Sequence, residues 1–315
     1  MIQITFQKPQ VKELNKLGFN CVDMHFHTKY SDGISKIQSV LKKARKREVG
    51  VAITDHNDIR GAIEAYNNRN GVFMVPGIEV TSYEGPDILL YFCNTQELQD
   101  YYIKYIKNFK GKDPNGRLKK SFVDLIEPSQ NYNCLVSLPH PCGVLWKSIP
   151  KFIEKYGHEK KLLEHVDAVE VMNSEQMKKA NLNALKLREQ WKKAFTGGSD
   201  GHSLWELGST VTFSYEHNLE AFLESIRKKK NYVTGKEVYL PKRVIPHTVA
   251  LRKHATYMPQ TLMEDFKTRV KPKIKYYINK KRVNARQTRL GSAISNWKAY
   301  KKTKIFIGNI INKSL

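Results

Sequence analysis

The sequence predicts an α/β barrel followed by a basic, mainly helical extension. Over the first 240 residues, short apolar runs alternate with segments of helical periodicity, which is the pattern of strands joined by helical crossovers. About seven or eight such units favour a closed or nearly closed barrel of parallel strands over an open sheet. The composition changes after this region, between residues 239 and 257. We therefore expect a barrel domain over residues 1–240 and a basic helical extension over residues 241–315.

The expected strands are short apolar runs bounded by polar or turn residues, such as GVAIT at residues 50–54. They cover residues 21–26, 50–54, 72–80, 88–92, 134–138, 168–172, 194–197 and 210–214. The expected helices carry apolar residues three or four positions apart, as at Ile37, Leu41 and Ala44. They cover residues 34–47, 59–68, 98–109, 118–126, a segment ending at 162–165, 177–193 and 219–230.

The charge of the chain is concentrated near its end. The formal net charge is +24, and residues 241–315 alone hold 19 Lys and Arg against 2 acidic residues, a net of +17. A basic segment of this density attracts polyanions such as nucleic acid or an anionic membrane surface. A solvated tail is the alternative interpretation.

The spacing of the cysteines and the length of the apolar runs indicate the cellular compartment. Cys21, Cys93, Cys134 and Cys142 show no paired C-x-x-C spacing, so they indicate core residues in a reducing compartment and not disulfides. The first 20 residues lack an apolar stretch, and no run approaches the ~18 apolar residues of a membrane span. We expect a cytoplasmic protein without a transmembrane segment; its oligomeric state stays open.

Histidine, aspartate and glutamate recur where the expected strands end, which is where α/β barrels carry their active sites. Asp23, His25 and His27 alternate along the first strand and therefore face one side of it. Asp32 follows in the next loop, before Gly33, which suits a tight turn. Later strands and strand ends add Asp55, His56, Glu79, His140, Glu170, Asp200 and His202.

This set of residue types predicts a metal centre. Mixed imidazole and carboxylate ligands suit Mn, Zn or Fe, and the candidates exceed what one ion needs, so we expect two or three divalent ions. Such ions clamp phosphoryl oxygens and generate a hydroxide nucleophile. The sequence contains neither G-x-x-x-x-G-K-[ST] nor G-x-G-x-x-G, which disfavours nucleotide hydrolysis of the P-loop kind and dinucleotide binding.

In order and spacing, these motifs resemble the four motifs of the polymerase and histidinol phosphatase (PHP) family. The residues that carry the resemblance are Asp23-Met24-His25-Phe26-His27-Thr28 with Ser31-Asp32-Gly33, Thr54-Asp55-His56, Gly77-Ile78-Glu79, Pro139-His140-Pro141 and Ser199-Asp200-Gly201-His202. The resemblance spans residues 20–214. It implies a distorted (βα)7 barrel with a trinuclear metal site at its mouth and a metal-dependent phosphoesterase activity.

The resemblance also implies how the ligands are shared. His25 and His27 would hold one ion, with Glu79 bridging and Asp200 completing the site. His140 would hold a second ion with Glu79. The third ion would be held by Asp32, His56 and His202.

One position departs from the family pattern. Many members carry a histidine shortly after the bridging glutamate, and the nearest equivalent here is Asp87, which can ligate a metal in its place. Asp23 and Asp55 are expected to orient imidazole N–H groups. Together with Glu79 and Asp200 they form the expected catalytic set.

Substrate contacts are expected from loops beside the ligands and from the extension. The loop residues are Lys29, Asn57, Trp146, Lys147 and Ser203. The extension interleaves positive charge with aromatic residues, which supply phosphate neutralisation and base stacking. Its expected nucleic-acid contacts are Lys271, Lys273, Lys275, Tyr276, Tyr277, Lys280, Lys281 and Arg282.

The favoured function is therefore a phosphoesterase acting on nucleotides or nucleic acid. The resemblance implies a 5′→3′ exonuclease or a nucleoside bisphosphate phosphatase. The alternatives are a small-metabolite phosphomonoesterase of the histidinol phosphatase type and a non-catalytic nucleic-acid-binding PHP protein. Metal-dependent amidohydrolases also begin with an H-x-H strand, but they usually need a lysine in mid-barrel, and no lysine ends an expected strand here. Apolar residues near the end of the chain, including Phe306 and Ile310, favour membrane-surface contact as another role for the extension.

Overall fold

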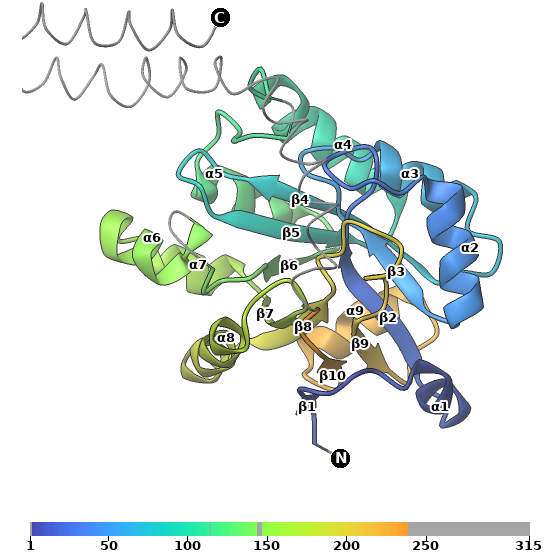
Figure 1. Ribbon diagram of the computed structural model, residues 1–315. Coiled ribbons are helices and arrows are strands. Elements are labelled where there is room, and N and C mark those ends of the chain that lie inside the picture. Colours follow the sequence, from blue (N-terminus) through green and yellow to red (C-terminus); the bar gives the residue numbers. More distant parts are fainter. Residues whose placement is uncertain (1, 114, 144–146, 239–315) are drawn as a thin grey trace, which may run out of the picture. The chain divides into compact units, whose positions relative to one another are not determined.

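The computed structural model describes residues 2–113, 115–143 and 147–238. Its strands form one curled sheet in the order β1-β10-β9-β2-β3-β4-β5-β6-β7-β8 (Figure 1). The strands are β1 (Ile4–Thr5), β2 (Asn20–Phe26), β3 (Gly50–Ile53), β4 (Met74–Thr81), β5 (Asp87–Phe92), β6 (Cys134–Leu138), β7 (Ala168–Asn173), β8 (Ala194–Gly198), β9 (Thr210–Ser214) and β10 (Tyr232–Gly235).

Helices surround the sheet (Figure 1). They are α1 (Val11–Lys16), α2 (Ile37–Arg47), α3 (Arg60–Asn67), α4 (Thr95–Tyr105), α5 (Phe122–Ile126), α6 (Ile149–Tyr156), α7 (Glu159–His165), α8 (Lys178–Trp191) and α9 (Leu219–Arg227), with short 3-10 turns at Lys107–Phe109 and Pro128–Asn131. Of the apolar positions predicted for α2, Ile37, Leu41 and Ala44 are buried together with Val40, whereas Ile34 precedes this helix and is 36% exposed. The predicted strands and helices are thus present, with ends shifted by a few residues; β1, α1, α6 and β10 were not predicted.

The prediction of an all-parallel sheet is wrong. β2, β3 and β4 are parallel, and so are β6, β7 and β8. However, β5 runs antiparallel to both β4 and β6, and β9 runs antiparallel to β2 and β10. The link from β4 to β5 is too short for a helical crossover, and the amide of Ser82 donates to the carbonyl of Pro86 across a tight hairpin. An apolar run in the sequence does not show whether the strand runs parallel or antiparallel to its neighbours.

The barrel closes between β8 and the pair β2 and β9 through irregular contacts. The hydroxyl of Thr212 in β9 accepts a hydrogen bond from the amide of Gly197 and donates to its carbonyl, at 2.8 and 2.9 Å. Beyond β8, the amide of Asp200 donates to the carbonyl of His25, and the amide of His27 donates to the carbonyl of Gly201. This seam confirms the predicted distorted barrel and brings the end of β2 beside the loop after β8.

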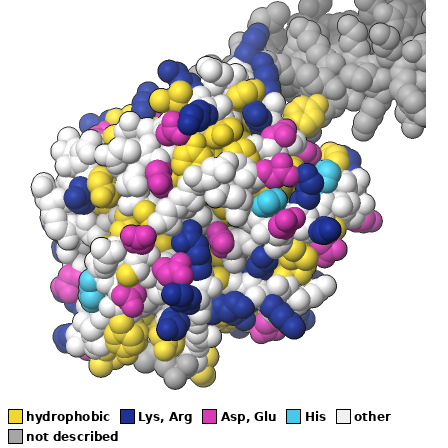
Figure 2. All heavy atoms as spheres, turned by 180° about the vertical axis from the view of Figure 1, so that it is seen from behind, with side chains coloured by type: hydrophobic (Ala, Val, Ile, Leu, Met, Phe, Trp, Pro, Cys, Tyr) yellow, Lys and Arg dark blue, Asp and Glu magenta, His cyan; other side chains and the backbone are white. Residues whose placement is uncertain are grey.

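The surface of the described residues mixes positive and negative side chains. On the face in Figure 2, Lys and Arg lie interspersed with Asp and Glu. The expected contacts at residues 271–282 and the predicted domain boundary at residue 240 lie outside the described residues and stay predictions. Within the described residues, no helix is long and apolar enough to cross a membrane.

Candidate metal centre

The structure brings all nine predicted ligands into one buried cluster at the end of the barrel where the parallel strands finish and the antiparallel strand β5 begins. The cluster contains five imidazoles and four carboxylates. His25 lies on β2, with His27 just beyond its end, and Glu79 lies on β4. The remaining members are Asp32, His56, Asp87, His140, Asp200 and His202.

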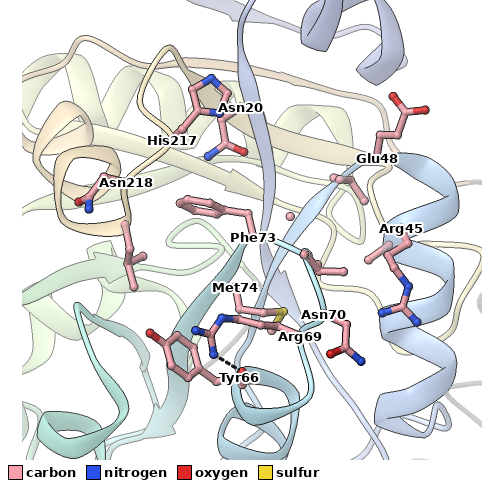
Figure 3. Close-up of a pocket in the computed structure, with 16 residues that line it drawn as sticks. Asn20, Arg45, Glu48, Tyr66, Arg69, Asn70, Phe73, Met74, His217 and Asn218 are labelled. Carbon is pink, nitrogen blue, oxygen red and sulfur yellow. Dashed lines mark hydrogen bonds between the residues drawn. The ribbon is translucent and has the colours of Figure 1, made fainter.

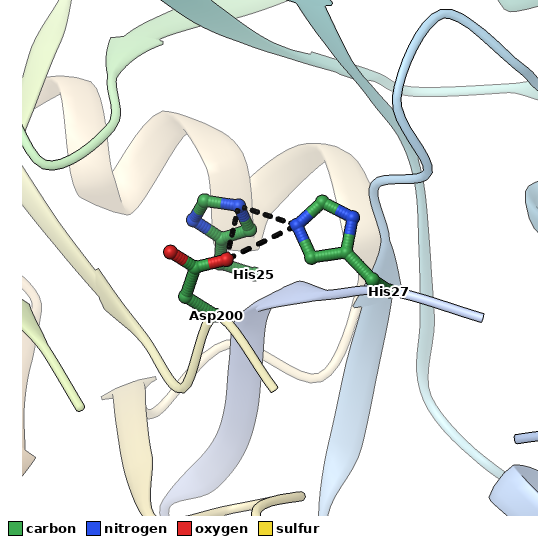
Figure 4. A group of neighbouring side chains, drawn as sticks. All are labelled: His25, His27 and Asp200. Carbon is green, nitrogen blue, oxygen red and sulfur yellow. Dashed lines mark hydrogen bonds and ion pairs between the residues drawn. The ribbon is translucent and has the colours of Figure 1, made fainter. Parts of the chain in front are cut away.

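The first corner of the cluster is formed by His25, His27 and Asp200 (Figure 4). The Nε2 atoms of the two imidazoles lie 3.1 Å apart. Asp200 Oδ1 lies 3.3 Å from His25 Nε2 and 3.1 Å from His27 Nε2. Two imidazole nitrogens and one carboxylate oxygen therefore converge on one point, as ligands of a single divalent ion do.

The second corner is formed by Asp32, His56 and His202. Asp32 Oδ2 lies 3.1 Å from His202 Nε2 and 3.7 Å from His56 Nε2. The Nδ1 atom of His202 lies 2.8 Å from the backbone carbonyl of Asp200. This contact favours a proton on Nδ1, and it leaves Nε2 as the nitrogen that faces Asp32.

The third corner is formed by Glu79, Asp87 and His140. His140 Nε2 lies 3.2 Å from Glu79 Oε1 and 3.7 Å from Asp87 Oδ2. Thr81 donates its hydroxyl hydrogen to Asp87 Oδ1 at 2.5 Å. Lys147 also reaches this corner, with its Nζ 2.8 Å from Asp87 Oδ2.

Glu79 lies between the corners. Its Oε2 is 3.4 Å from His25 Nε2, 3.3 Å from His27 Nε2 and 3.1 Å from His56 Nδ1. Its Oε1 faces His140 instead. One carboxylate therefore has its two oxygens directed at different corners, which is the arrangement of a bridging ligand.

The chemistry of this cluster fits divalent ions. Buried charges need partners, yet His27 Nδ1 and Glu79 Oε2 are buried atoms without a hydrogen bond among the described residues. Burial by itself raises the pKa of Glu79, but the imidazoles of His56 and His25 outweigh it and hold that pKa well below its usual range. Glu79 is therefore ionised, and an ion would satisfy the atoms that the protein leaves without hydrogen bonds.

Two ligands sit on strained backbone. His140 and Asp200 have φ values of 32° and 54°, in the left-handed region that non-glycine residues rarely adopt. Each follows a buried strand directly. The tight turn at each strand end is held by hydrogen bonds, since the amide of His140 donates to Glu170 and that of Asp200 donates to His25.

Asp23 and Asp55 brace the loops that carry predicted ligands and, among the described residues, hydrogen-bond to backbone amides and hydroxyl groups and not to an imidazole ring, which differs from the prediction. Asp23 accepts hydrogen bonds from the backbone amides of His25, Ser199 and Gly208. Burial raises its pKa to about 6, although these hydrogen bonds lower it. Asp55 accepts from the amide and hydroxyl of Thr28 and from the hydroxyl of Ser31.

The predicted substrate contacts have different outcomes. Lys147 reaches the cluster. Asn57 is held inside the loops, because its amide group donates to the carbonyl of Gly116 and accepts from the amide of Thr81. Ser203 is buried and donates to Glu206 at 2.7 Å, and substrate contact by Asn57 and Ser203 stays a prediction. Lys29 is exposed, 5.1 Å from the ring centre of Tyr30, and Trp146 lies outside the described residues.

Three supporting residues were not assigned a role from the sequence. Glu170 on β7 lies 2.9 Å from His25 Nδ1. Asn173 donates to both Glu170 and Asp200, at 2.9 and 3.1 Å. Glu175 forms a further candidate ligand group with Asp200 and His202. The acidic residue inside the run AVEVMN was the signal for Glu170, since an unpaired charge within a buried strand needs a partner.

A pocket of about 680 Å³ lies away from the metal cluster (Figure 3). Its lining includes Asn20, Gly50 and Met74, which begin β2, β3 and β4. The predicted ligands lie at the opposite, carboxyl ends of these strands. The pocket is therefore at the other end of the barrel and is not part of the candidate site.

An α/β barrel that gathers imidazoles and carboxylates at its strand ends is the architecture of a metal-dependent hydrolase. The family model of the PHP domain matches residues 23–194, and the model described as PHP-associated matches residues 178–231. The chain belongs to the PHP family, whose members are metal-dependent phosphoesterases, and the predicted resemblance is confirmed.

The comparisons also find relatives and similar solved structures. The uncharacterized protein MJ0417 of Methanocaldococcus jannaschii is 28% identical over 202 residues, which cover 63% of this chain and 72% of that protein. A two-domain protein from Bacteroides vulgatus that contains a predicted PHP-like metal-dependent phosphoesterase has a TM-score of 0.51 at 16% identity, covering 75% of this chain and 69% of that one. The lesion-specific endonuclease PfuEndoQ of Pyrococcus furiosus has a TM-score of 0.54 at 17% identity, covering 68% and 57%.

Proposed function

We propose that this chain hydrolyses phosphoester bonds in nucleotides or nucleic acid. The observation that carries the proposal is the convergence of five imidazoles and four carboxylates in one buried cluster. Divalent ions bound there supply the Lewis acidity and the activated water that phosphoester hydrolysis needs. Mn, Zn and Fe all suit this ligand set.

The protein's own residues would orient the ligands. Glu170 accepts the Nδ1 proton of His25, which leaves the Nε2 lone pair of that ring directed at Asp200. The backbone carbonyl of Asp200 has the same role for His202. Glu79 sets the spacing between corners, because its two oxygens face different imidazoles. These contacts fix the ring orientations before an ion or a substrate arrives.

The choice of a nucleotide or nucleic acid substrate rests on charge. The net charge of +17 over residues 241–315 exceeds what binding a small phosphate requires, and Lys and Arg supply the salt-dependent part of nucleic-acid affinity. On the barrel face in Figure 2 both signs of charge are mixed, so the extension is the stronger candidate for attracting a polyanion. The fold similarity to a lesion-specific endonuclease is consistent with this substrate class.

A substrate panel tests the proposal. Purified, manganese-loaded protein would be incubated with 5′-labelled single-stranded DNA and RNA, beside histidinol phosphate and a nucleoside 3′,5′-bisphosphate. A His25→Ala variant would run in parallel, since it removes one ligand of the first corner. We expect the wild type alone to release nucleotides or to remove phosphate from the bisphosphate.

The other outcomes are distinct. Turnover of histidinol phosphate alone would replace the proposal with a small-metabolite phosphatase. Absence of turnover with metal bound would favour a binding protein without catalysis. Equal activity of the wild type and His25→Ala would show that the hydrolysis comes from a contaminant or from another site.

A further inference from the structure

We infer that the ammonium group of Lys147 takes the place of a third metal ion, so that this centre binds two ions. The inference rests on the proposed metal centre and concerns its composition. It starts from the third corner, where His140 Nε2 lies 3.2 Å from Glu79 Oε1 and 3.7 Å from Asp87 Oδ2.

Lys147 contacts Asp87, the most buried carboxylate of the third corner. The Nζ atom lies 2.8 Å from Asp87 Oδ2, and the Asp87 side chain has no exposed surface. The Lys147 side chain is 39% exposed. It therefore extends from the solvent side, with its ammonium group against the buried Asp87. At this separation the ammonium group and the carboxylate form an ion pair.

This contact competes with a divalent ion for the same oxygen. An ion bound to Asp87 Oδ2 would sit about 2.0–2.2 Å from it, beside an ammonium group that is already in contact with that oxygen. Two cations this close repel one another, and the repulsion is strong away from bulk water. Asp87 Oδ2 therefore binds either the ammonium group or an ion. The lysine is part of the chain and is always present, so it has the advantage over an ion that must bind from solution.

The other two corners differ in this respect. Among residues 2–113, 115–143 and 147–238, the ion pairs of Asp32, Glu79 and Asp200 are all with histidines. Imidazoles become ligands when they lose a proton, whereas an ammonium group has no lone pair to offer a metal. The first and second corners can therefore accept ions, and the third is already neutralised by a fixed positive charge.

The inferred centre thus holds two ions, and the ammonium group of Lys147 supplies a fixed positive charge at the third corner. One ion would be held by His25, His27 and Asp200. The other would be held by Asp32 with His202 and His56, whose Nε2 atoms lie 3.1 and 3.7 Å from Asp32 Oδ2. Lys147 then presents a positive charge at the third corner that does not depend on metal supply. Such a charge suits a substrate phosphate oxygen.

Metal stoichiometry tests the inference without relying on activity. The full chain would be stripped with a chelator, reloaded with Mn²⁺, freed of excess ion, and analysed by inductively coupled plasma mass spectrometry. We expect two ions per chain for the wild type and for Lys147→Arg, which keeps the charge. We expect three for Lys147→Met, which keeps the length of the side chain but removes the charge.

Each other result has a defined meaning. Three ions on the wild type, or two on Lys147→Met with a wild-type circular dichroism spectrum, would overturn the inference while leaving the metal centre intact. Fewer than two ions on the wild type would overturn the proposed centre and the inference with it. If Lys147→Met does not fold, Lys147→Gln serves in its place under the same criteria.

Discussion

Glu170 Oε1 lies 2.9 Å from His25 Nδ1, and this contact decides which nitrogen of the ring faces the metal cluster. The other carboxylate oxygen, Oε2, accepts the backbone amide of His140 at 2.8 Å. One glutamate on β7 therefore positions a ligand of the first corner and the strained turn that carries a ligand of the third. The metal cluster depends on this residue although it contributes no ligand itself.

Glu170→Gln should weaken metal binding without abolishing it. An amide oxygen in place of the carboxylate holds the proton of His25 less firmly, and loss of such a partner lowers metal affinity by about 10–100-fold. Titration with Mn²⁺ followed by calorimetry would measure the change. Glu164→Gln, an exposed position on α7, is the matched control and should bind as the wild type does. Unchanged affinity in Glu170→Gln would exclude the positioning role.

Asp23→Asn and Asp55→Asn should differ in their effect on stability. Both oxygens of Asp23 accept backbone N–H groups, so an asparagine NH₂ would oppose a donor, at a cost of about 1–3 kcal/mol. One oxygen of Asp55 accepts from the Thr28 hydroxyl, which can rotate and accept from asparagine instead. Chemical denaturation would compare the free energies of unfolding. Equal losses in the two variants would contradict this account.

Gly198→Ala should destabilise the barrel at its closing seam. A Cβ atom there would overlap the backbone and Cβ of His25, and overpacking of this kind costs about 1–3 kcal/mol. Because β2 must shift to make room, we also expect lower manganese content per folded chain. Thermal unfolding and metal analysis would measure both effects. A variant as stable as the wild type with full metal content would show that the two strands do not approach this closely.

Deleting residues 241–315 should remove most of the salt-dependent affinity for nucleic acid. The deleted segment carries +17 of the total +24, and every phosphate that the protein no longer neutralises reduces the slope of log K against log salt by about 0.7–0.9. Fluorescence anisotropy with labelled single-stranded DNA at several salt concentrations would measure the slope. Full-length His27→Ala is the control and should keep the wild-type slope. An unchanged slope after deletion would assign the extension to a membrane surface or a protein partner.

The clustering of these side chains could be predicted because most of them lie near the ends of strands that the sequence marks clearly. Asp200 and His202 come directly after an apolar run, as His56 and His140 do, and strand ends of one barrel meet at one mouth. The i, i+2 spacing of His25 and His27 then predicted that both face one side, at the end of β2 and just beyond it. These inferences needed only local patterns and one general property of barrels.

The remaining features depend on contacts that no local pattern encodes. The reversed directions of β5 and β9 come from the lengths and paths of their connections, and apolar runs are the same in either direction. Asp23 was predicted to hold an imidazole, but its partners are amides of β2 and of the segment from Ser199 to Gly208. The pairing of Asp87 with Lys147 joins positions 60 residues apart.

Metal-dependent turnover tests the central claim most directly. Wild-type protein would be stripped with a chelator, and hydrolysis of 5′-labelled DNA, 5′-labelled RNA and a nucleoside 3′,5′-bisphosphate would be followed as Mn²⁺ is returned. Glu79→Gln, which alters the carboxylate between the corners, would be measured beside it. We predict no turnover without metal, recovery in step with bound Mn²⁺, and none in Glu79→Gln. Turnover that persists after complete metal removal, or that is undiminished in Glu79→Gln, would contradict the assignment of this cluster as a metal-dependent phosphoesterase site.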